Sequence, residues 1–105
     1  QQHAWAKALS TLSTHAIVGE VRSKGMLGAV ELVRTPGSAM RIAPDAAAAV
    51  FCRNYAIQHG LMARQVGDSL ILSPPLIITT DEIEQLVTGL RAALDATATA
   101  FGIAC

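Results

Sequence analysis

The sequence contains few aromatic residues and few charges. Aromatic residues make up 4% and charged residues 15% of its 105 residues. Eight basic side chains balance eight acidic ones, so the formal net charge is zero. A neutral chain lacks the positive field that draws proteins to nucleic acids or to anionic membrane surfaces. We therefore expect neither nucleic acid nor a membrane among its partners.

Long apolar runs are also absent, although hydrophobic residues make up 51% of the chain. Runs such as AAAAVFC at 46–52 are well short of the roughly 18 residues that cross a bilayer. The hydrophobic share is nevertheless high for a small domain, whose surface is large relative to its volume. We interpret the excess as a surface that another part of a protein covers.

Cysteine is scarce, and the two cysteines are far apart in the sequence. Cys52 and Cys105 form no CxxC pair, so a disulfide framework is not expected and a reducing cytoplasm fits. We expect Cys52 to be a buried thiol in a helix. The sequence starts at Gln1 inside a helical pattern, without an initiator methionine or a signal-peptide segment. We therefore expect a C-terminal piece of a longer protein.

Hydrophobic periodicity and turn signals predict the order helix, two strands, helix, two strands, helix. The expected elements are a helix at 3–13, strands within 17–33 around a turn at 23–25, a helix at 45–59, strands at 61–66 and 69–73, and a helix that opens with a Thr79–Glu82 capping box. A loop is expected at 34–40, and Pro44 suits a first helical position. This order predicts an α+β fold, with a small, mainly antiparallel sheet and helices on one face.

The second strand of the first pair is almost wholly apolar over Met26–Val33. Strands that are apolar on both sides are usually covered on both faces of their sheet. We therefore expect this strand to be covered on both faces.

Residues 67–70 spell Gly-Asp-Ser-Leu, the four letters of a hydrolase signature. In those hydrolases the serine is a nucleophile whose histidine base lies later in the chain, and an unassisted serine hydroxyl is a weak nucleophile. Here all three histidines, His3, His15 and His59, precede Ser69. Gly-Asp between two apolar strands is typical of a hairpin turn, and we interpret the motif as one.

Other polar and glycine residues have structural explanations. The histidines show no metal-ligand spacing, and we interpret them as surface or capping residues. Glycines 19, 25 and 28 form no GxGxxG motif and suit close packing in strands and a turn. The carboxylates in the first turn of the last helix are explained by the helix macrodipole; they are Asp81, Glu82 and Glu84.

Arg64 is the residue with two competing interpretations. In a strand at 61–66 it shares a face with Met62 and Val66. A guanidinium among apolar neighbours is costly to desolvate unless it meets an anion, and its fork matches a carboxylate bidentately. The alternative is an arginine at a sheet edge that reaches water or pairs with Asp68. The residues alone leave both interpretations open.

Two segments carry a family resemblance that covers nearly the whole chain. VGEVRSKGMLGAVELV (18–33) and GLMARQVGDSLILSPPLIITTDEIEQLVTGLRAALDAT (60–97) resemble the C-terminal small domain of class III aminotransferases. The most specific part is the spaced pattern Gly60-Leu61, Arg64, Gly67-Asp68 and Pro74-Pro75-Leu76, followed by an acidic helix start. The resemblance implies a type I fold, pyridoxal phosphate as cofactor and a homodimer.

The resemblance also distinguishes subgroups by where the substrate arginine lies. The ornithine and acetylornithine type has it just before the Pro-Pro pair, around Ile71, where this chain is aliphatic. The omega-amino-acid:pyruvate type has it at the position of Arg64. In that type it binds the substrate carboxylate and swings aside for amines that lack one. Arg64 is therefore expected to be a substrate-binding residue, and the chain to resemble an omega-transaminase.

The cofactor lysine and phosphate-binding residues of the family belong to its large domain. Lys7 and Lys24 match neither, so residues 1–105 are expected to be one small domain that is inactive alone. This domain would close one side of the active site of its parent. The alternative is a non-catalytic α+β regulatory or oligomerisation module, because a fold does not determine a function.

Overall fold

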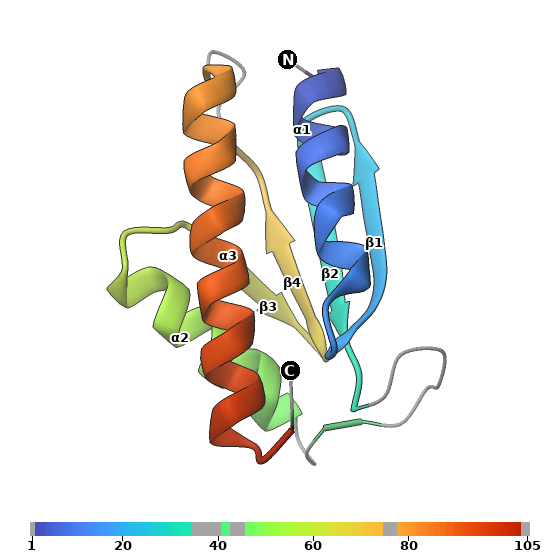
Figure 1. Cartoon of the computed structure of the whole chain (residues 1–105), viewed down its shortest axis with the longest axis vertical. Coiled ribbons are helices and arrows are strands. Elements are labelled where there is room, and N and C mark those ends of the chain that lie inside the picture. The colour runs from blue at the N-terminus through green and yellow to red at the C-terminus, as the bar shows by residue number, and fades with distance from the viewer. Residues whose placement is uncertain (1, 35–40, 43–45, 75–77, 104–105) are drawn as a thin grey trace.

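The computed structural model describes residues 2–34, 41–42, 46–74 and 78–103 (Figure 1). The elements follow the predicted order. They are α1 (Gln2–Ser10), the short 3-10 helix η1 (Thr11–Thr14), β1 (Val18–Lys24), β2 (Leu27–Leu32), α2 (Ala47–Gln58), β3 (Arg64–Val66), β4 (Ser69–Leu72) and α3 (Thr80–Ala100). The predicted loop at 34–40 beyond Arg34, Pro44 as a first helical residue and Cys105 lie outside the described residues.

The strands form one four-stranded sheet in the order β1-β2-β4-β3. Every neighbouring pair is antiparallel, so the expected α+β fold with an antiparallel sheet is confirmed. The two hairpins, β1–β2 and β3–β4, are joined where β2 pairs with β4. Because β3 lies at one edge of the sheet, residues on β3 have a strand neighbour on one side only.

One face of the sheet carries the core. Its buried residues are Val30 and Leu32 on β2 and Leu70 and Leu72 on β4. Helices α1 and α3 lie over the sheet in Figure 1, and buried residues of all three helices belong to the same cluster. A Cβ atom on Gly28 would come within 2.6 Å of a Leu9 methyl, so the missing side chain permits α1 to lie close to β2.

The ends of α2 and α3 follow from local sequence. Gly60 has φ of +86°, and the Leu61 N–H donates to the Ala56 carbonyl at 2.9 Å, which is the Schellman arrangement that ends α2. The predicted capping box is confirmed, because the Glu82 N–H donates to the Thr79 hydroxyl and the Thr79 N–H donates to the Glu82 carboxylate. The hydrogen bond from the Thr79 backbone holds the pKa of Glu82 below its ordinary value.

Two expectations need correction. The first hairpin turns at residues 25–26, so Ser23 and Lys24 belong to β1. Strand β3 begins at Arg64 rather than at Leu61, because the Leu61 N–H closes the end of α2. Strand β2 carries the core on one face, and Leu27 on its other face is 51% exposed, so coverage of that face by another domain stays a prediction.

The contact between α2 and α3 includes the expected buried thiol. Cys52 is fully buried in α2, which confirms the prediction for this residue. Burial raises the pKa of the thiol to about 11, and a hydrogen bond with Thr97 on α3 opposes this shift. The thiol therefore remains protonated near neutral pH, and packing is the role that this environment supports.

Candidate functional site

Arg64 is the first residue of β3, at the edge of the sheet. Its side chain is exposed, and the flanking Met62 and Val66 are 90% and 62% exposed. In the chain by itself the guanidinium is exposed at a sheet edge, as the alternative interpretation expects, and a role of Arg64 in substrate binding stays a prediction. Among the described residues the Arg64 side chain has neither a hydrogen-bond nor an ion-pair partner.

Asp68, the partner that the alternative named for Arg64, pairs with another arginine. The Arg41 Nε atom donates to one Asp68 carboxylate oxygen at 2.7 Å, and an Arg41 terminal nitrogen donates to the other at 3.2 Å. The Leu32 N–H donates to the Asp68 carbonyl at 2.9 Å. The Asp68 carboxylate thus pairs with Arg41, and among the described residues it forms no hydrogen bond or ion pair with Arg64.

The Gly-Asp-Ser-Leu motif is confirmed as a turn. Gly67 has φ of +56° and forms, with Asp68, the connection between β3 and β4. Ser69 lies in β4 and is paired with Val66 in the antiparallel ladder. Residues on the two sides of this turn are therefore held in fixed register, which positions Arg64 relative to β4.

The register places four residues in one row across the sheet. Arg22 on β1 is opposite Ala29 on β2, Ala29 is opposite Ile71 on β4, and Ile71 is opposite Arg64 on β3. Because side chains alternate along a strand, this row lies on the face away from the core. We name this side of the sheet the outer face. It presents a guanidinium at each end of the row and small or aliphatic side chains between them.

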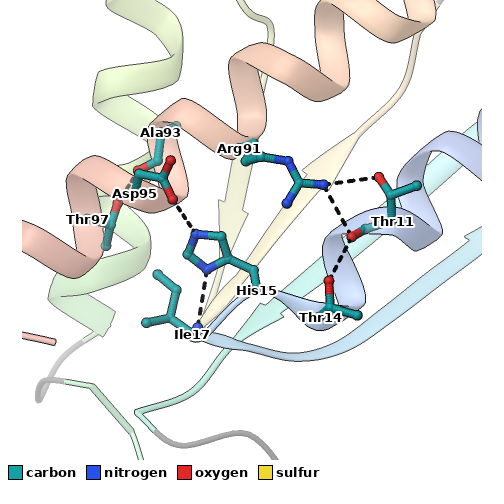
Figure 2. Close-up of polar contacts among 8 residues, drawn as sticks. All are labelled: Thr11, Thr14, His15, Ile17, Arg91, Ala93, Asp95 and Thr97. Atoms are coloured by element: carbon teal, nitrogen blue, oxygen red, sulfur yellow. Dashed lines mark hydrogen bonds and ion pairs between the residues drawn. The ribbon is translucent and has the colours of Figure 1, made fainter. Parts of the chain in front are cut away.

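His15 corrects the expectation that the histidines are surface or capping residues. Figure 2 shows its ring between η1 and α3, where Nε2 lies 2.7 Å from an Asp95 carboxylate oxygen. The His15 side chain is 5% exposed. The Ile17 N–H donates to Nδ1 at 3.3 Å, so Nδ1 accepts and Nε2 carries the proton that Asp95 accepts. With both nitrogens engaged, His15 is a tether between chain segments rather than a catalytic base.

A second tether lies beside it. The Arg91 guanidinium on α3 donates to the carbonyl and hydroxyl oxygens of Thr11 at 3.2 and 3.3 Å (Figure 2). His59 caps α2 through a contact of 2.8 Å between Nδ1 and the Tyr55 carbonyl, as expected, and His3 is exposed. Across the described residues no group of three histidine, cysteine or acidic side chains is arranged to hold a metal ion.

Both lysines are exposed in the described part of the chain. Lys24 is exposed at the end of β1, and Lys7 is exposed on α1. Lys7 borders an open groove of about 580 Å³ between α1 and α3, whose lining does not include Arg64.

Comparison with known proteins gives the family. The chain is 40% identical over 94 residues to a putrescine–pyruvate aminotransferase of Pseudomonas aeruginosa, and the match covers 90% of this chain. It is 32% identical over 90 residues to an omega-aminotransferase of Caulobacter vibrioides. The chain belongs to the aminotransferases of the omega-transaminase type. No protein-family model matches it.

Solved transaminases contain the same fold. An omega-transaminase of Pseudomonas jessenii in complex with PMP superposes with a TM-score of 0.88 and 30% identity. A transaminase with L-ala superposes with a TM-score of 0.89 and 30% identity. Both matches cover 96% of this chain but only 22% and 23% of the solved chains. The chain spans about a fifth of the length of the curated relatives it matches.

No helix in the described part of this aminotransferase chain is both long enough and apolar enough to cross a membrane.

Proposed function

We propose that residues 1–105 are the C-terminal small domain of a class III, pyridoxal-phosphate-dependent transaminase. The parent would move an amino group from an amine or omega-amino acid to a keto acid such as pyruvate. The aminotransferase relatives support this proposal over the non-catalytic alternative. We further propose a cytoplasmic homodimer whose cofactor lysine lies in a large domain outside this chain.

The cofactor supplies the electron sink for amino transfer, and the protein supplies binding, orientation and charge. The contribution proposed for this chain is Arg64. The observation that carries the proposal is that, among the described residues, the Arg64 side chain has no hydrogen-bond or ion-pair partner, while the Asp68 carboxylate pairs with Arg41. An unpaired guanidinium fork is suited to a carboxylate, with which it forms two parallel charge-assisted hydrogen bonds.

The outer face of the sheet supports a role in closing the active site. Leu27 and Val66 expose apolar surface there, and Arg64 lies on the same face. We propose that the large domain covers this face and encloses Arg64. Exclusion of water would strengthen the pairing between its guanidinium and a substrate carboxylate. For an amine without a carboxylate the arginine would swing aside.

Replacement of Arg64 in the full-length protein tests this function. A bidentate charge-assisted pair contributes about 1.5–3 kcal/mol, so Arg64→Ala should lower kcat/KM for alanine or pyruvate roughly tenfold to a hundredfold. The half-reaction with an amine such as 1-phenylethylamine should be nearly unchanged. The two half-reactions are measured separately, because a complete cycle with pyruvate mixes them.

Two further variants complete the test. Arg64→Lys should recover only part of the loss, because an ammonium keeps the charge without the fork. Arg22→Ala removes an exposed arginine from the other end of the same row and serves as the matched control. An equal loss for both substrates in Arg64→Ala would mean that Arg64 supports the fold instead of binding the carboxylate.

A further inference from the structure

We propose that Ile71 is a positioning residue for Arg64, an inference that rests on the proposed function. Ile71 and Arg64 are direct partners in the antiparallel pairing of β4 with β3. The Cβ atoms of such partners are about 4.5–5.5 Å apart, and their side chains lie on the same face. The hydrocarbon stem of Arg64 and the side chain of Ile71 are therefore neighbours.

Ile71 is the neighbour best suited to support this stem. Met62, which precedes β3, and Val66, which follows Arg64 on the same face of β3, are 90% and 62% exposed, whereas Ile71 is partly buried. Isoleucine is branched at Cβ and holds few rotamers, so it offers a stiff apolar surface. Arginine commonly lays its methylene stem on such a surface while its charged head remains in water.

Because β3 is an edge strand, Arg64 has a cross-strand neighbour on one side only in the described sheet. On one side of Arg64 is Ile71 on β4, and on the other side the described sheet has no further strand. Neither Asp68 nor any other described side chain anchors the guanidinium. Contact with Ile71 would keep the stem over the sheet and reduce the rotamer freedom that carboxylate binding must remove.

The test uses the full-length protein and a double-mutant cycle. Ile71→Ala should raise KM for pyruvate about threefold to tenfold, with kcat changed less than about twofold, because the fork is present but less well positioned. Ile71→Val keeps the branched Cβ and should behave nearly as the parent protein does. The amine half-reaction should not change in either variant.

Making Ile71→Ala in the Arg64→Ala variant distinguishes a role of Ile71 in positioning Arg64 from a role in packing alone. If Ile71 acts through Arg64, Ile71→Ala should add no further loss of pyruvate recognition once Arg64 is gone. A similar loss with and without Arg64, or an unchanged KM for pyruvate in Ile71→Ala, overturns the inference. Should Ile71→Ala not fold, Ile71→Thr keeps a branched strand residue and is judged by the same two criteria.

The outcomes distinguish this inference from the function on which it rests. If Arg64→Ala impairs the carboxylate and amine half-reactions equally, both proposals fall. If Arg64→Ala impairs the carboxylate half-reaction but not the amine half-reaction, and Ile71→Ala leaves the KM for pyruvate unchanged, only the positioning role is overturned.

Discussion

Arg64 and Ile71 are directly opposite one another across the β3–β4 hairpin. These are also the positions between which the resemblance to class III aminotransferases distinguishes two subgroups, one with its arginine at 64 and one with it around 71. Because cross-strand partners share a face and a place along the sheet, an arginine on either strand projects from nearly the same point. If Arg64 binds the substrate carboxylate, as proposed, an arginine at position 71 would approach the same carboxylate from the neighbouring strand.

This geometry predicts that the two residues can be exchanged. In the full-length protein, Arg64→Ile combined with Ile71→Arg should recover at least about a third of the kcat/KM for pyruvate that Arg64→Ile alone loses. The new isoleucine would support the stem of the new arginine. The measurement is the pyruvate half-reaction in both variants. A combined variant no better than Arg64→Ile would show that the two positions are not equivalent for carboxylate binding.

The tether between His15 and Asp95 predicts a stability effect without a functional one. Asp95→Ala leaves the Nε2–H of a buried histidine without its acceptor, which should cost about 1–3 kcal/mol of unfolding free energy. Glu84 is exposed and lies beyond the first turn of α3, whose acidic residues are Asp81 and Glu82, so Glu84→Ala should change stability by less than about 0.5 kcal/mol. Chemical denaturation of the three proteins measures both effects, and equal losses would contradict the assigned role.

The buried thiol predicts both low reactivity and a loss of stability at high pH. In a Cys105→Ser variant, Cys52 should not react with a thiol reagent near neutral pH until denaturant is added, because the reactive thiolate is disfavoured. Folding raises the pKa of Cys52 from its ordinary value of 9.0 to about 11, so the unfolded chain loses its proton first. The unfolding free energy should therefore fall as the pH rises from about 9 towards 11. Cys52→Ala should abolish this fall.

The features predicted correctly from the sequence depend on residues close together in the chain. The capping box spans four residues, and the Gly67-Asp68 turn lies between the strands that it joins. The missed features join distant residues. Arg41 and Asp68 are 27 residues apart, and no spacing rule connects them.

The burial of individual side chains was the other property that the sequence predicted poorly. The apolar pattern at Met26–Val33 indicated a strand correctly, but it could not distinguish a face covered within this chain from one left for another domain. For the same reason the sequence does not predict the exposure of the Arg64 side chain, because this exposure depends on what lies against the outer face. His15 was missed because its partner Asp95 is 80 residues away.

The exposed apolar residues predict which surface meets the rest of the parent protein. Leu27 on the outer face of the sheet and Ile57 on α2 are both 51% exposed, so they form a matched pair. If the large domain covers the outer face, Leu27→Lys should lower both the unfolding temperature and the activity of the full-length enzyme, because domain docking would bury the new charge. Ile57→Lys should be tolerated. In the chain by itself, both substitutions should be tolerated, because both side chains already contact water. Thermal unfolding and activity of the full-length variants measure the difference, and equal effects in the full-length protein would argue against docking through the outer face.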